Sequence, residues 1–297
     1  SVDFRPLVIL GAGRSGTNML RDILTQLPGY ATWPCDEINY IWRHGNRDFP
    51  TDAIPPERAT EPLARWIQAR FAQIQRRSGA HTVVEKTCAN TLRVPFVAAC
   101  LPAHALFLEI VRDGRDVACS AAKRWTASLD LNYLWKKAKW VPKSDLPYYA
   151  TRYLAARLHR LRSKERRVST WGPRYEGMEE DLRRLPLIEA CAQQWEECVL
   201  RCRDGLQAVP EERRLSIRYE DFVQDPLAGM ATIARFLGEE WSADQLQPLL
   251  QGVRAGSVGN WKKQLDPETA DRMEFRHAEA LAWAASLAPS AAAPAQP

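Results

Sequence analysis

The sequence has no uninterrupted apolar run of about 18 residues, the length that a helix needs to cross a membrane. The nearest approach, residues 94–111, is broken by two prolines, a histidine and a glutamate. Nor does the chain begin with the apolar stretch of a secretory signal peptide. These absences argue against a transmembrane helix and favour a cytoplasmic location.

Cysteine patterns that hold metals are lacking as well. The chain has seven cysteines, an odd number, and none is spaced as in a paired metal-ligand motif. Cys191, Cys198 and Cys202 recur at helical intervals, which indicates one buried helix face. We therefore expect reduced thiols, as is usual in the cytoplasm, and no bound metal.

The composition fits one large α/β domain, with 45% hydrophobic residues for a core and 26% charged residues for a surface. The net charge of +5 is distributed unevenly. Residues 123–167 contain thirteen Lys and Arg but three acidic residues, so the rest of the chain is net negative. This asymmetry favours a surface that meets an anionic or membrane-surface molecule, although a solvated helix face gives the same pattern. No nucleic-acid partner is expected.

The chain is organised around residues 6–20, PLVILGAGRSGTNML. The apolar run at its start is typical of a buried parallel strand. Gly11, Gly13 and Gly16 then allow a tight turn beside a bound anion, and helical spacing of apolar residues begins at Thr17. A strand, a glycine turn and a helix in this order place backbone N–H groups where a phosphate or a sulfate binds.

Three kinds of nucleotide site fit this stretch. The dinucleotide pattern G-x-G-x-x-G is present with Asp36 about 20 residues later, but residues 29–34 make a poor second strand. The P-loop pattern of nucleoside triphosphatases is incomplete, because Thr17 replaces its lysine and Asn18 replaces its Mg²⁺-binding hydroxyl. The third kind keeps the P-loop shape and binds a 5′-phosphate that carries a sulfate, through Arg14 and without a metal.

A second candidate anion site lies in residues 109–120, EIVRDGRDVACS. Arg112 follows a predicted buried strand, and Ser120 lies eight residues later in a predicted helix. Ligands gather at the carboxyl ends of parallel strands, and a guanidinium beside a hydroxyl suits a phosphate group. Surface ion pairing among Arg112, Asp113, Arg115 and Asp116 is the structural alternative.

Short apolar strands alternate with amphipathic helices along the chain. Strands are predicted over residues 7–10, 82–85, 105–111 and 215–219, and helices over residues 17–27, 59–77, 90–101, 115–125, 147–167, 186–209 and 226–237. The alternation predicts an α/β fold of P-loop type, with a central parallel β-sheet flanked by helices. We expect one domain over residues 1–285, in which a basic, aromatic-rich helical insertion over residues 126–185 forms the acceptor side, and a disordered tail over residues 286–297.

Four motifs resemble, in order, those of the sulfotransferases that use 3′-phosphoadenosine 5′-phosphosulfate (PAPS). GRSGTN at residues 13–18 resembles their 5′-phosphosulfate loop, and VRDGRDVACS at residues 111–120 resembles their 3′-phosphate segment. RYEDF at residues 218–222 resembles their Tyr-Glu-Asp stretch, and RAGSVGNWK at residues 254–262 resembles their late loop, which closes over the 3′-phosphate. The resemblance therefore covers nearly the whole chain.

The resemblance implies a set of nucleotide-binding residues. They are Gly13, Arg14, Ser15, Gly16, Thr17 and Asn18 in the 5′ loop, Arg112 and Ser120 at the 3′-phosphate, Tyr219 near the adenine, and Arg254, Gly256 and Trp261 in the late loop. Arg14 is expected to act in catalysis as well. Two positions depart from the family pattern, since Ala255 replaces a phosphate-binding lysine and Asn18 replaces a common second threonine.

Two further catalytic residues are implied. Lys86 follows a predicted buried strand, and in the family a lysine here contacts the bridging oxygen and helps the 5′-phosphate depart, because a fixed cation stabilises the charge that gathers there. Glu37 lies where tyrosylprotein and glycan sulfotransferases carry a catalytic glutamate, so it is the expected base. Asp36, Glu85 and His44 are the alternatives.

The sequence thus predicts a sulfotransferase that moves a sulfuryl group from PAPS to an acceptor hydroxyl and releases 3′-phosphoadenosine 5′-phosphate (PAP). A carbohydrate or glycoconjugate is the expected acceptor, because Glu37 rather than a histidine is the expected base and the insertion is aromatic and basic. The alternatives are a P-loop nucleoside or nucleotide kinase and a non-catalytic nucleotide- or glycan-binding module.

Overall fold

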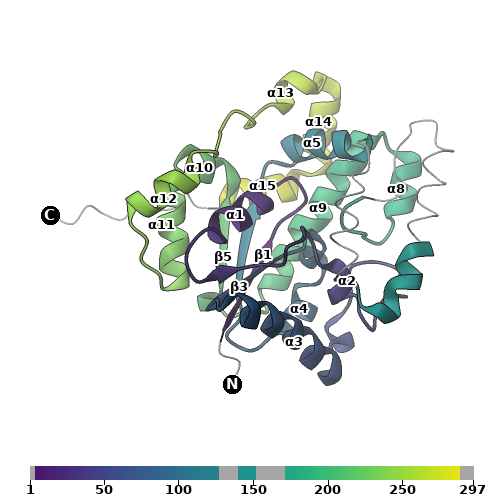
Figure 1. Cartoon of the computed structure of the whole chain (residues 1–297). Helices are drawn as coiled ribbons and strands as arrows, with labels where there is room; N and C mark the ends of the chain where they lie inside the picture. Colours follow the sequence, from purple (N-terminus) through teal and green to yellow (C-terminus); the bar gives the residue numbers. More distant parts are fainter. Residues whose placement is uncertain (1–3, 127–139, 152–170, 288–297) are drawn as a thin grey trace.

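A computed structural model of the protein describes residues 4–126, 140–151 and 171–287 (Figure 1). Within them, five parallel strands form one sheet in the order β2-β3-β1-β4-β5. The strands are β1 (Arg5–Leu10), β2 (Tyr30–Ala31), β3 (Thr82–Lys86), β4 (Leu106–Val111) and β5 (Arg214–Arg218). The predicted fold class, an α/β fold with a central parallel sheet, is confirmed.

Helices surround this sheet. They are α1 (Thr17–Leu24), α2 (Asn39–Trp42), α3 (Glu61–Ser78), α4 (Val94–Cys100), α5 (Gly114–Thr126), α8 (Met178–Arg184), α9 (Leu187–Leu206), α10 (Tyr219–Gln224), α11 (Pro226–Leu237), α12 (Ala243–Leu250), α13 (Trp261–Gln264), α14 (Pro267–Arg276) and α15 (Ala278–Ser286). Cys191, Cys198 and Cys202 lie buried on α9 without a disulfide, as the helical spacing predicts. Among the described helices, none is both long and apolar enough to span a membrane.

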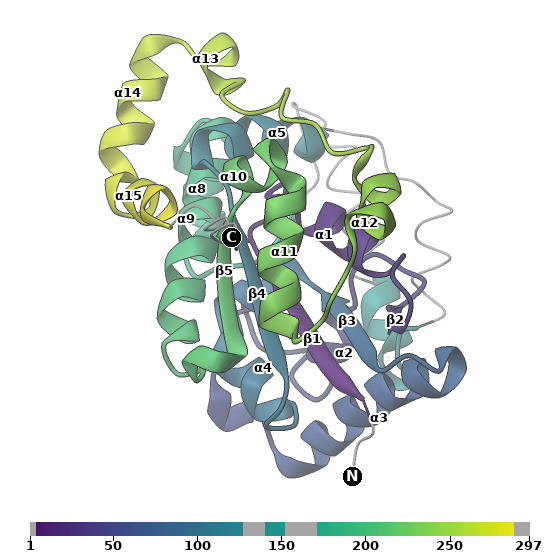
Figure 2. The same ribbon diagram turned by 90° about the vertical axis from the view of Figure 1, so that its left-hand side faces the viewer.

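Both faces of the sheet are covered, which explains the continuous apolar run of β1. Its successive side chains alternate between the faces. Leu7 and Ile9 pack in a cluster with α1, α10, α11 and α12, whereas Val8 and Leu10 pack in another with α2, α3 and α4. Figure 2 shows α11 in front of the strands. A strand that is buried on both sides has no need of polar residues.

The glycine turn lies at the centre of the fold. β1 is the middle strand, and the chain continues from it to β2 and β3 on one side before it forms β4 and β5 on the other. Open α/β sheets bind ligands at such a switch point, at the carboxyl ends of the strands. Gly16 precedes α1 in a left-handed conformation with φ at 97°. A Cβ atom there would lie 2.7 Å from the Tyr219 ring, so both the turn and the packing require glycine.

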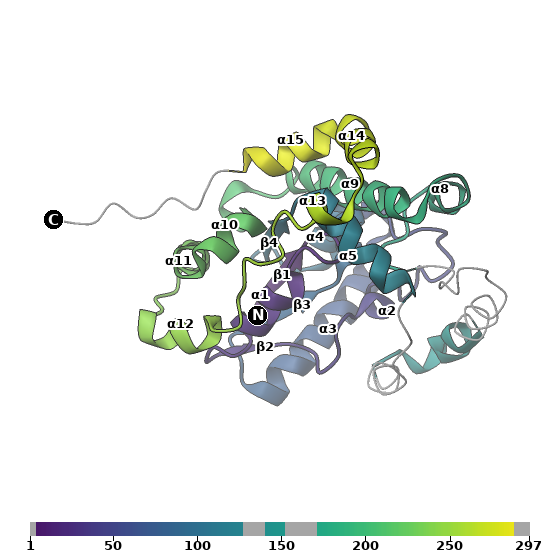
Figure 3. The same ribbon diagram turned by 90° about the horizontal axis from the view of Figure 1, so that it is seen from above.

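The end of β4 is fixed by its neighbour in space, α9. Trp195 Nε1 on α9 donates a hydrogen bond to the carbonyl oxygen of Arg112 at 3.0 Å. Gly114 begins α5 directly against the same indole, since a Cβ atom there would lie 2.3 Å from it. Figure 3 shows α5 running beside α9. These contacts set the direction in which the segment after β4 leaves the sheet.

Three expectations about the elements are corrected. Residues 29–34 contain β2, a two-residue edge strand that pairs with β3. A 3₁₀ turn over Cys88–Arg93 precedes α4, which begins at Val94 because Pro95 suits the first turn of a helix. The last predicted strand ends one residue early, because Tyr219 begins α10. The insertion, the helix expected within it and the C-terminal tail lie largely outside the described residues, so the domain boundaries stay predictions.

Candidate active site

The 5′ loop and the segment after β4 meet through two side chains. Arg14 Nε donates a hydrogen bond to Ser120 Oγ at 2.9 Å, although 106 residues separate the two. Arg14 has a left-handed backbone with φ at 75°, which is uncommon for a residue other than glycine. The contact brings the predicted 5′-phosphosulfate loop and the predicted 3′-phosphate segment into one site.

Arg112 connects the remaining motifs to this site. Its Nη1 donates to the carbonyl oxygen of Arg14 at 3.2 Å, and its Nη2 donates to that of Ser257 at 2.9 Å. The guanidinium lies 4.5 Å from the centre of the Tyr219 ring. Tyr219 in turn shares a hydrogen bond of 3.1 Å between its hydroxyl and Ser257 Oγ. The four motifs therefore lie together in the fold.

The arginines of this site favour an anion. Partial burial, followed by the charges of Arg124 and Arg112, lowers the pKa of Arg14. No carboxylate among the described residues forms an ion pair with Arg14. Ser15 Oγ and Arg112 Nε are buried and make no hydrogen bond within the described structure. Unmatched donors beside clustered cations are the groups that phosphate and sulfate oxygens satisfy, so these residues fit such a ligand.

Lys86 lies at the carboxyl end of β3 between two carboxylates. Its Nζ donates to Asp36 Oδ1 at 2.9 Å and to Glu37 Oε1 at 3.1 Å. Arg21 on α1 also binds Asp36 Oδ1, at 2.6 Å. Burial acts to lower the pKa of Lys86, but the charges of Glu37 and Asp36 outweigh it and raise the pKa above its ordinary value. The ammonium therefore stays charged although its side chain is only 2% exposed.

The candidate bases occupy different environments. Glu85 is fully buried, accepts hydrogen bonds from Thr87 and Asn90, and has a pKa that burial raises to about 7. His44 Nδ1 lies 2.9 Å from Asp145, and its ring stacks on a tryptophan. The Glu37 side chain is 25% exposed, accepts the backbone N–H of Cys88 at 3.3 Å and lies beside Lys86. Of these, Glu37 combines solvent access with proximity to the lysine.

Asp36 is a weaker candidate for the base because two cations hold it. Burial acts to raise the pKa of Asp36, but Lys86 and Arg21 outweigh this effect and lower the pKa below its ordinary value. A carboxylate with a depressed pKa accepts a proton poorly. The position of Asp36 also argues against the dinucleotide alternative, since its carboxylate is bound by Lys86 and Arg21.

The remaining predicted residues are placed as follows. Thr17 is buried and Asn18 is exposed, both on the first turn of α1. In the late loop, Arg254 is exposed and donates to backbone carbonyls of its own segment, including that of Val253 at 3.1 Å. Gly256 is exposed as well. The structure therefore brings Ser257 to Arg112 and leaves Arg254 apart from it.

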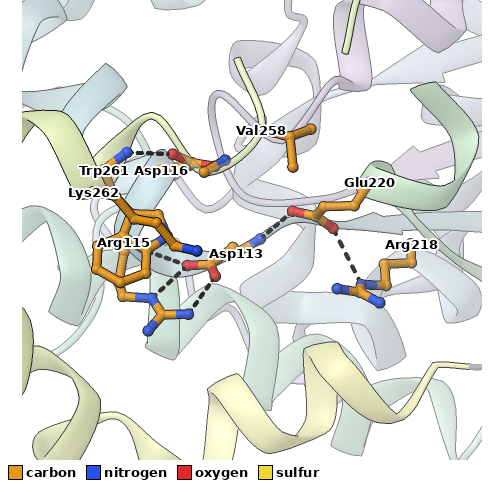
Figure 4. A pocket seen from close by; sticks show the side chains of 9 residues that line it. Asp113, Arg115, Asp116, Arg218, Glu220, Val258, Trp261 and Lys262 are labelled. Atoms are coloured by element: carbon orange, nitrogen blue, oxygen red, sulfur yellow. Dashed lines mark hydrogen bonds and ion pairs between the residues drawn. The ribbon is translucent and has the colours of Figure 1, made fainter. Parts of the chain in front are cut away.

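Trp261 lies on the far side of the late loop, in the pocket that Figure 4 shows. The guanidinium of Arg115 lies 4.0 Å from its ring centre, and Asp113 pairs with Arg115 at 2.7 Å. The ion pairing expected as the structural alternative thus forms between Arg115 and Asp113, and also between Arg112 and Asp116. Arg112 approaches Asp116 at 3.8 Å and keeps its other contacts within the candidate site.

Several tryptophans that could stack on a sugar are part of the core. Trp33, Trp42 and Trp125 are 3%, 0% and 2% exposed, so they offer no surface to a ligand. Trp171 differs, since it is partly exposed and lies against the 5′ loop. A Cβ atom on Gly13 would lie 3.2 Å from its ring, so a side chain there would crowd it.

Sequence reasoning missed two roles that the structure makes visible. Asp36 joins Lys86 to Arg21, and Asp116 accepts two backbone N–H groups of the late loop. Asp116 lies within the candidate anion site at residues 109–120, so the sequence already pointed to this segment as functional. Arg21 carried no such signal, because an arginine in the middle of a helix is ordinary.

A strand, a glycine turn and a helix around an arginine-lined site define a P-loop-type anion-binding protein. A model of the sulfotransferase family matches residues 6–171 and 165–243, which is more than half of the chain. The chain belongs to the sulfotransferase family, as its motifs predict, and is an enzyme of that class.

Solved structures of similar fold are sulfotransferases too. They include the sulfotransferase domain of the Synechococcus PCC 7002 olefin synthase, with 16% identity, a TM-score of 0.55 and coverage of 94% of this chain and 95% of that one. A sulfotransferase from Alicyclobacillus acidocaldarius has 19% identity, a TM-score of 0.52 and 95% coverage of both chains. Mouse sulfotransferase SULT7A1, complexed with PAP, has 13% identity, a TM-score of 0.50 and coverage of 97% and 91%. No curated protein matches the chain in sequence.

Proposed function

We propose that the protein transfers a sulfuryl group from PAPS to an acceptor hydroxyl. The observation that carries this proposal is the contact between Arg14 and Ser120, because it joins two anion-binding segments into one site. A nucleotide with a phosphosulfate at its 5′ end and a phosphate at its 3′ position has two anionic groups to match. The mouse sulfotransferase of similar fold, which is complexed with PAP, supports the same donor.

Different residues bind the two anionic ends of the nucleotide. Backbone N–H groups at the amino end of α1 and the Arg14 side chain hold the 5′-phosphosulfate. Arg112 and Ser120 hold the 3′-phosphate, since a guanidinium donates paired hydrogen bonds and the hydroxyl adds a third. The ring of Tyr219 packs against the Arg112 guanidinium and supports it. Orientation and electrostatics of this kind supply much of the rate in comparable group transfers.

In the transfer step, Lys86 meets the charge that develops on the leaving oxygen. An ammonium has three N–H donors, and Asp36 and Glu37 occupy two of them among the described contacts. The third remains for the oxygen that bridges sulfur and phosphorus. The bond between sulfur and that oxygen breaks, its electron pair stays on the oxygen, and Lys86 stabilises the resulting charge.

Glu37 takes the proton of the acceptor. Its carboxylate is partly exposed beside Lys86, so an acceptor hydroxyl can reach it from solvent. As the hydroxyl oxygen forms its bond to sulfur, its proton passes to Glu37, and the products are a sulfate ester, PAP and a protonated glutamate. Before the transfer, Lys86 Nζ lies 3.1 Å from Glu37 Oε1 and helps to hold the carboxylate in place.

A carbohydrate or glycoconjugate is the acceptor class that we propose. Glu37 as the base supports it through the resemblance to glycan sulfotransferases. The excess of Lys and Arg in residues 123–167 supports it too, because many glycans carry anionic groups that such a surface attracts. Trp171 offers a partly exposed ring next to the 5′ loop on which a sugar face can stack.

Two measurements test the donor and the acceptor. PAP should raise the melting temperature of the protein more than ATP with Mg²⁺ does, and the reverse order would favour a nucleoside or nucleotide kinase. Radiolabelled sulfate should then pass from PAPS into the glycan fraction of a cell extract, and EDTA should not stop it. Label in lipid, phenol or peptide fractions alone would contradict the acceptor class and leave the donor standing.

A further inference from the structure

The late loop, residues 254–262, is fastened to α5 by one buried carboxylate. Asp116 Oδ2 accepts the backbone N–H of Gly259 at 2.7 Å, and its Oδ1 accepts that of Trp261 at 2.9 Å. The Asp116 side chain is 1% exposed. Hydrogen bonds to a charged acceptor are stronger than those between neutral groups, so this is a firm attachment.

The other half of the late loop is fastened to the 3′-phosphate residues. The carbonyl oxygen of Ser257 accepts a hydrogen bond from Arg112 Nη2, and its hydroxyl pairs with that of Tyr219. Asp116 also lies 3.8 Å from Arg112. The position of the loop and the orientation of Arg112 therefore depend on each other, with Asp116 in contact with both.

The positions of the late loop where a cationic side chain could bind a phosphate contribute little to this attachment. Ala255 stands where the family pattern has a phosphate-binding lysine, and Arg254 donates to carbonyls of its own segment. The hydrogen bonds to Asp116 and Arg112 come from backbone groups of the loop instead.

We propose that Asp116 is a positioning residue that holds the late loop over Arg112 in the free enzyme and so sets the preference for a 3′-phosphorylated nucleotide. Without Asp116, the Ser257 carbonyl moves away and Arg112 loses the partner that orients its guanidinium. The proposal rests on the proposed function, since it concerns the PAP end of that site.

The chain offers a matched control in Asp113, three residues before Asp116 in the same segment. Asp113 pairs with Arg115, and among the described residues it makes no hydrogen bond or ion pair with the late loop. Figure 4 shows both acids. Asp116→Asn and Asp113→Asn remove the same charge. Affinity for PAP and for adenosine 5′-monophosphate, which lacks the 3′-phosphate, is measured by calorimetry.

Asp116→Asn should weaken PAP binding by about tenfold or more, the scale of one charged hydrogen bond, and change the affinity for adenosine 5′-monophosphate by less than about threefold. Asp113→Asn should change neither by more than about threefold. Equal losses for both nucleotides in Asp116→Asn, or no loss for PAP, would overturn the proposal. Wild-type protein that fails to bind PAP would instead contradict the proposed function.

Amide hydrogen exchange gives a second readout that needs no variant. The Gly259 and Trp261 amides should be protected in the nucleotide-free wild type, because both donate to Asp116. Exchange at the rate of an unstructured peptide would overturn the proposal, even if Asp116→Asn fails to fold. Where that variant does fold, it should lose the protection at these two amides while its other helices keep theirs.

Discussion

At one end of the candidate site a buried ammonium lies between two carboxylates, and at the other end Arg14 and Arg112 lie together, with Arg14 bound to Ser120. Lys86 is balanced by Asp36 and Glu37 within 3.1 Å. Arg14 and Arg112 repel each other enough to contribute to the lowered pKa of Arg14. At the Lys86 end, the positive charge is neutralised by carboxylates of the protein. At the arginine end, a bound anion is needed to neutralise the positive charge.

This difference assigns different tasks to the two ends. A charge-balanced, buried arrangement changes little when a ligand arrives, which suits groups that act on the reacting atoms. A cluster of cations gains most when an anion binds, which suits recognition. Substitutions at the Lys86 end should therefore change the rate of transfer, and those at the arginine end should change nucleotide affinity.

The largest effect is expected at Glu37. Glu37→Gln keeps the size of the side chain and removes the proton acceptor, so turnover should fall by roughly 10² to 10⁴. Affinity for PAP should change by less than about threefold, because we expect Glu37 to face the acceptor rather than the nucleotide. Single-turnover transfer from PAPS and calorimetric titration with PAP separate the two quantities.

His44→Ala is the control for this experiment, because His44 is held by Asp145 and a stacked tryptophan away from Lys86. It should keep near-normal turnover. If Glu37→Gln is active and His44→Ala or Glu85→Gln is not, Glu37 is not the base. A large loss of PAP affinity in Glu37→Gln would contradict the proposal that the Lys86 end sets the rate and the arginine end sets the nucleotide affinity.

A second prediction concerns the acid next to Lys86 in β3. Burial raises the pKa of Glu85 from 4.5 to about 7, so the folded protein holds a proton that the unfolded chain releases more easily. The stabilisation is complete below about pH 4.5 and is lost as the pH rises through about 7. Relative to Glu85→Gln, the wild type should lose about 2–3 kcal/mol of unfolding free energy between about pH 5 and 8.

Urea denaturation of both proteins across this pH range measures the difference. The glutamine side chain stays neutral, so only the wild type should show the decline that comes from Glu85. Parallel profiles would mean that Glu85 is ionised in the folded protein. In that case a further buried negative charge would lie next to Lys86, and the charges at the Lys86 end would not be balanced.

The third prediction concerns Arg112. Arg112→Ala should weaken PAP binding by about 1.5–3 kcal/mol, the range for a hydrogen bond to a charged group. The loss should be much smaller for adenosine 5′-phosphosulfate, which lacks the 3′-phosphate. Calorimetry with both ligands measures this, and equal losses would show that Arg112 does not bind the 3′-phosphate.

Much of the fold was accessible from the sequence because its strands are buried on both faces. β1 is apolar from Pro6 to Leu10, and β4 is apolar apart from Glu109. Asp225 with Pro226 marks the start of α11, where the aspartate caps the helix by accepting the Ala228 N–H. β2 was missed because an edge strand of two residues leaves no periodic pattern. Its pairing with β3 comes from tertiary structure.

The site was accessible only where a motif is continuous in sequence. The 5′ loop and Arg112 stand in such motifs, and the structure brings both to the ends of neighbouring strands. The contacts of Asp36 with Arg21 and Lys86 join three separate segments, so no local pattern encodes them. The same holds for Asp116, whose partners are backbone groups that any residue supplies.

The smallest effect is predicted for Ser120. This residue contacts Arg14, which we assign to the 5′ end of the nucleotide, and is expected to bind the 3′-phosphate together with Arg112. Its hydroxyl accepts from Arg14 Nε and is also expected to donate to the 3′-phosphate. Ser120→Ala removes one hydrogen bond and should weaken PAP binding by about 0.5–1.5 kcal/mol in calorimetry. A loss confined to PAP means that Ser120 acts on the 3′-phosphate. An equal loss for adenosine 5′-phosphosulfate means that Ser120 acts by orienting Arg14 toward the 5′ end of the nucleotide. Ser120 would then contribute to binding at both ends of the site.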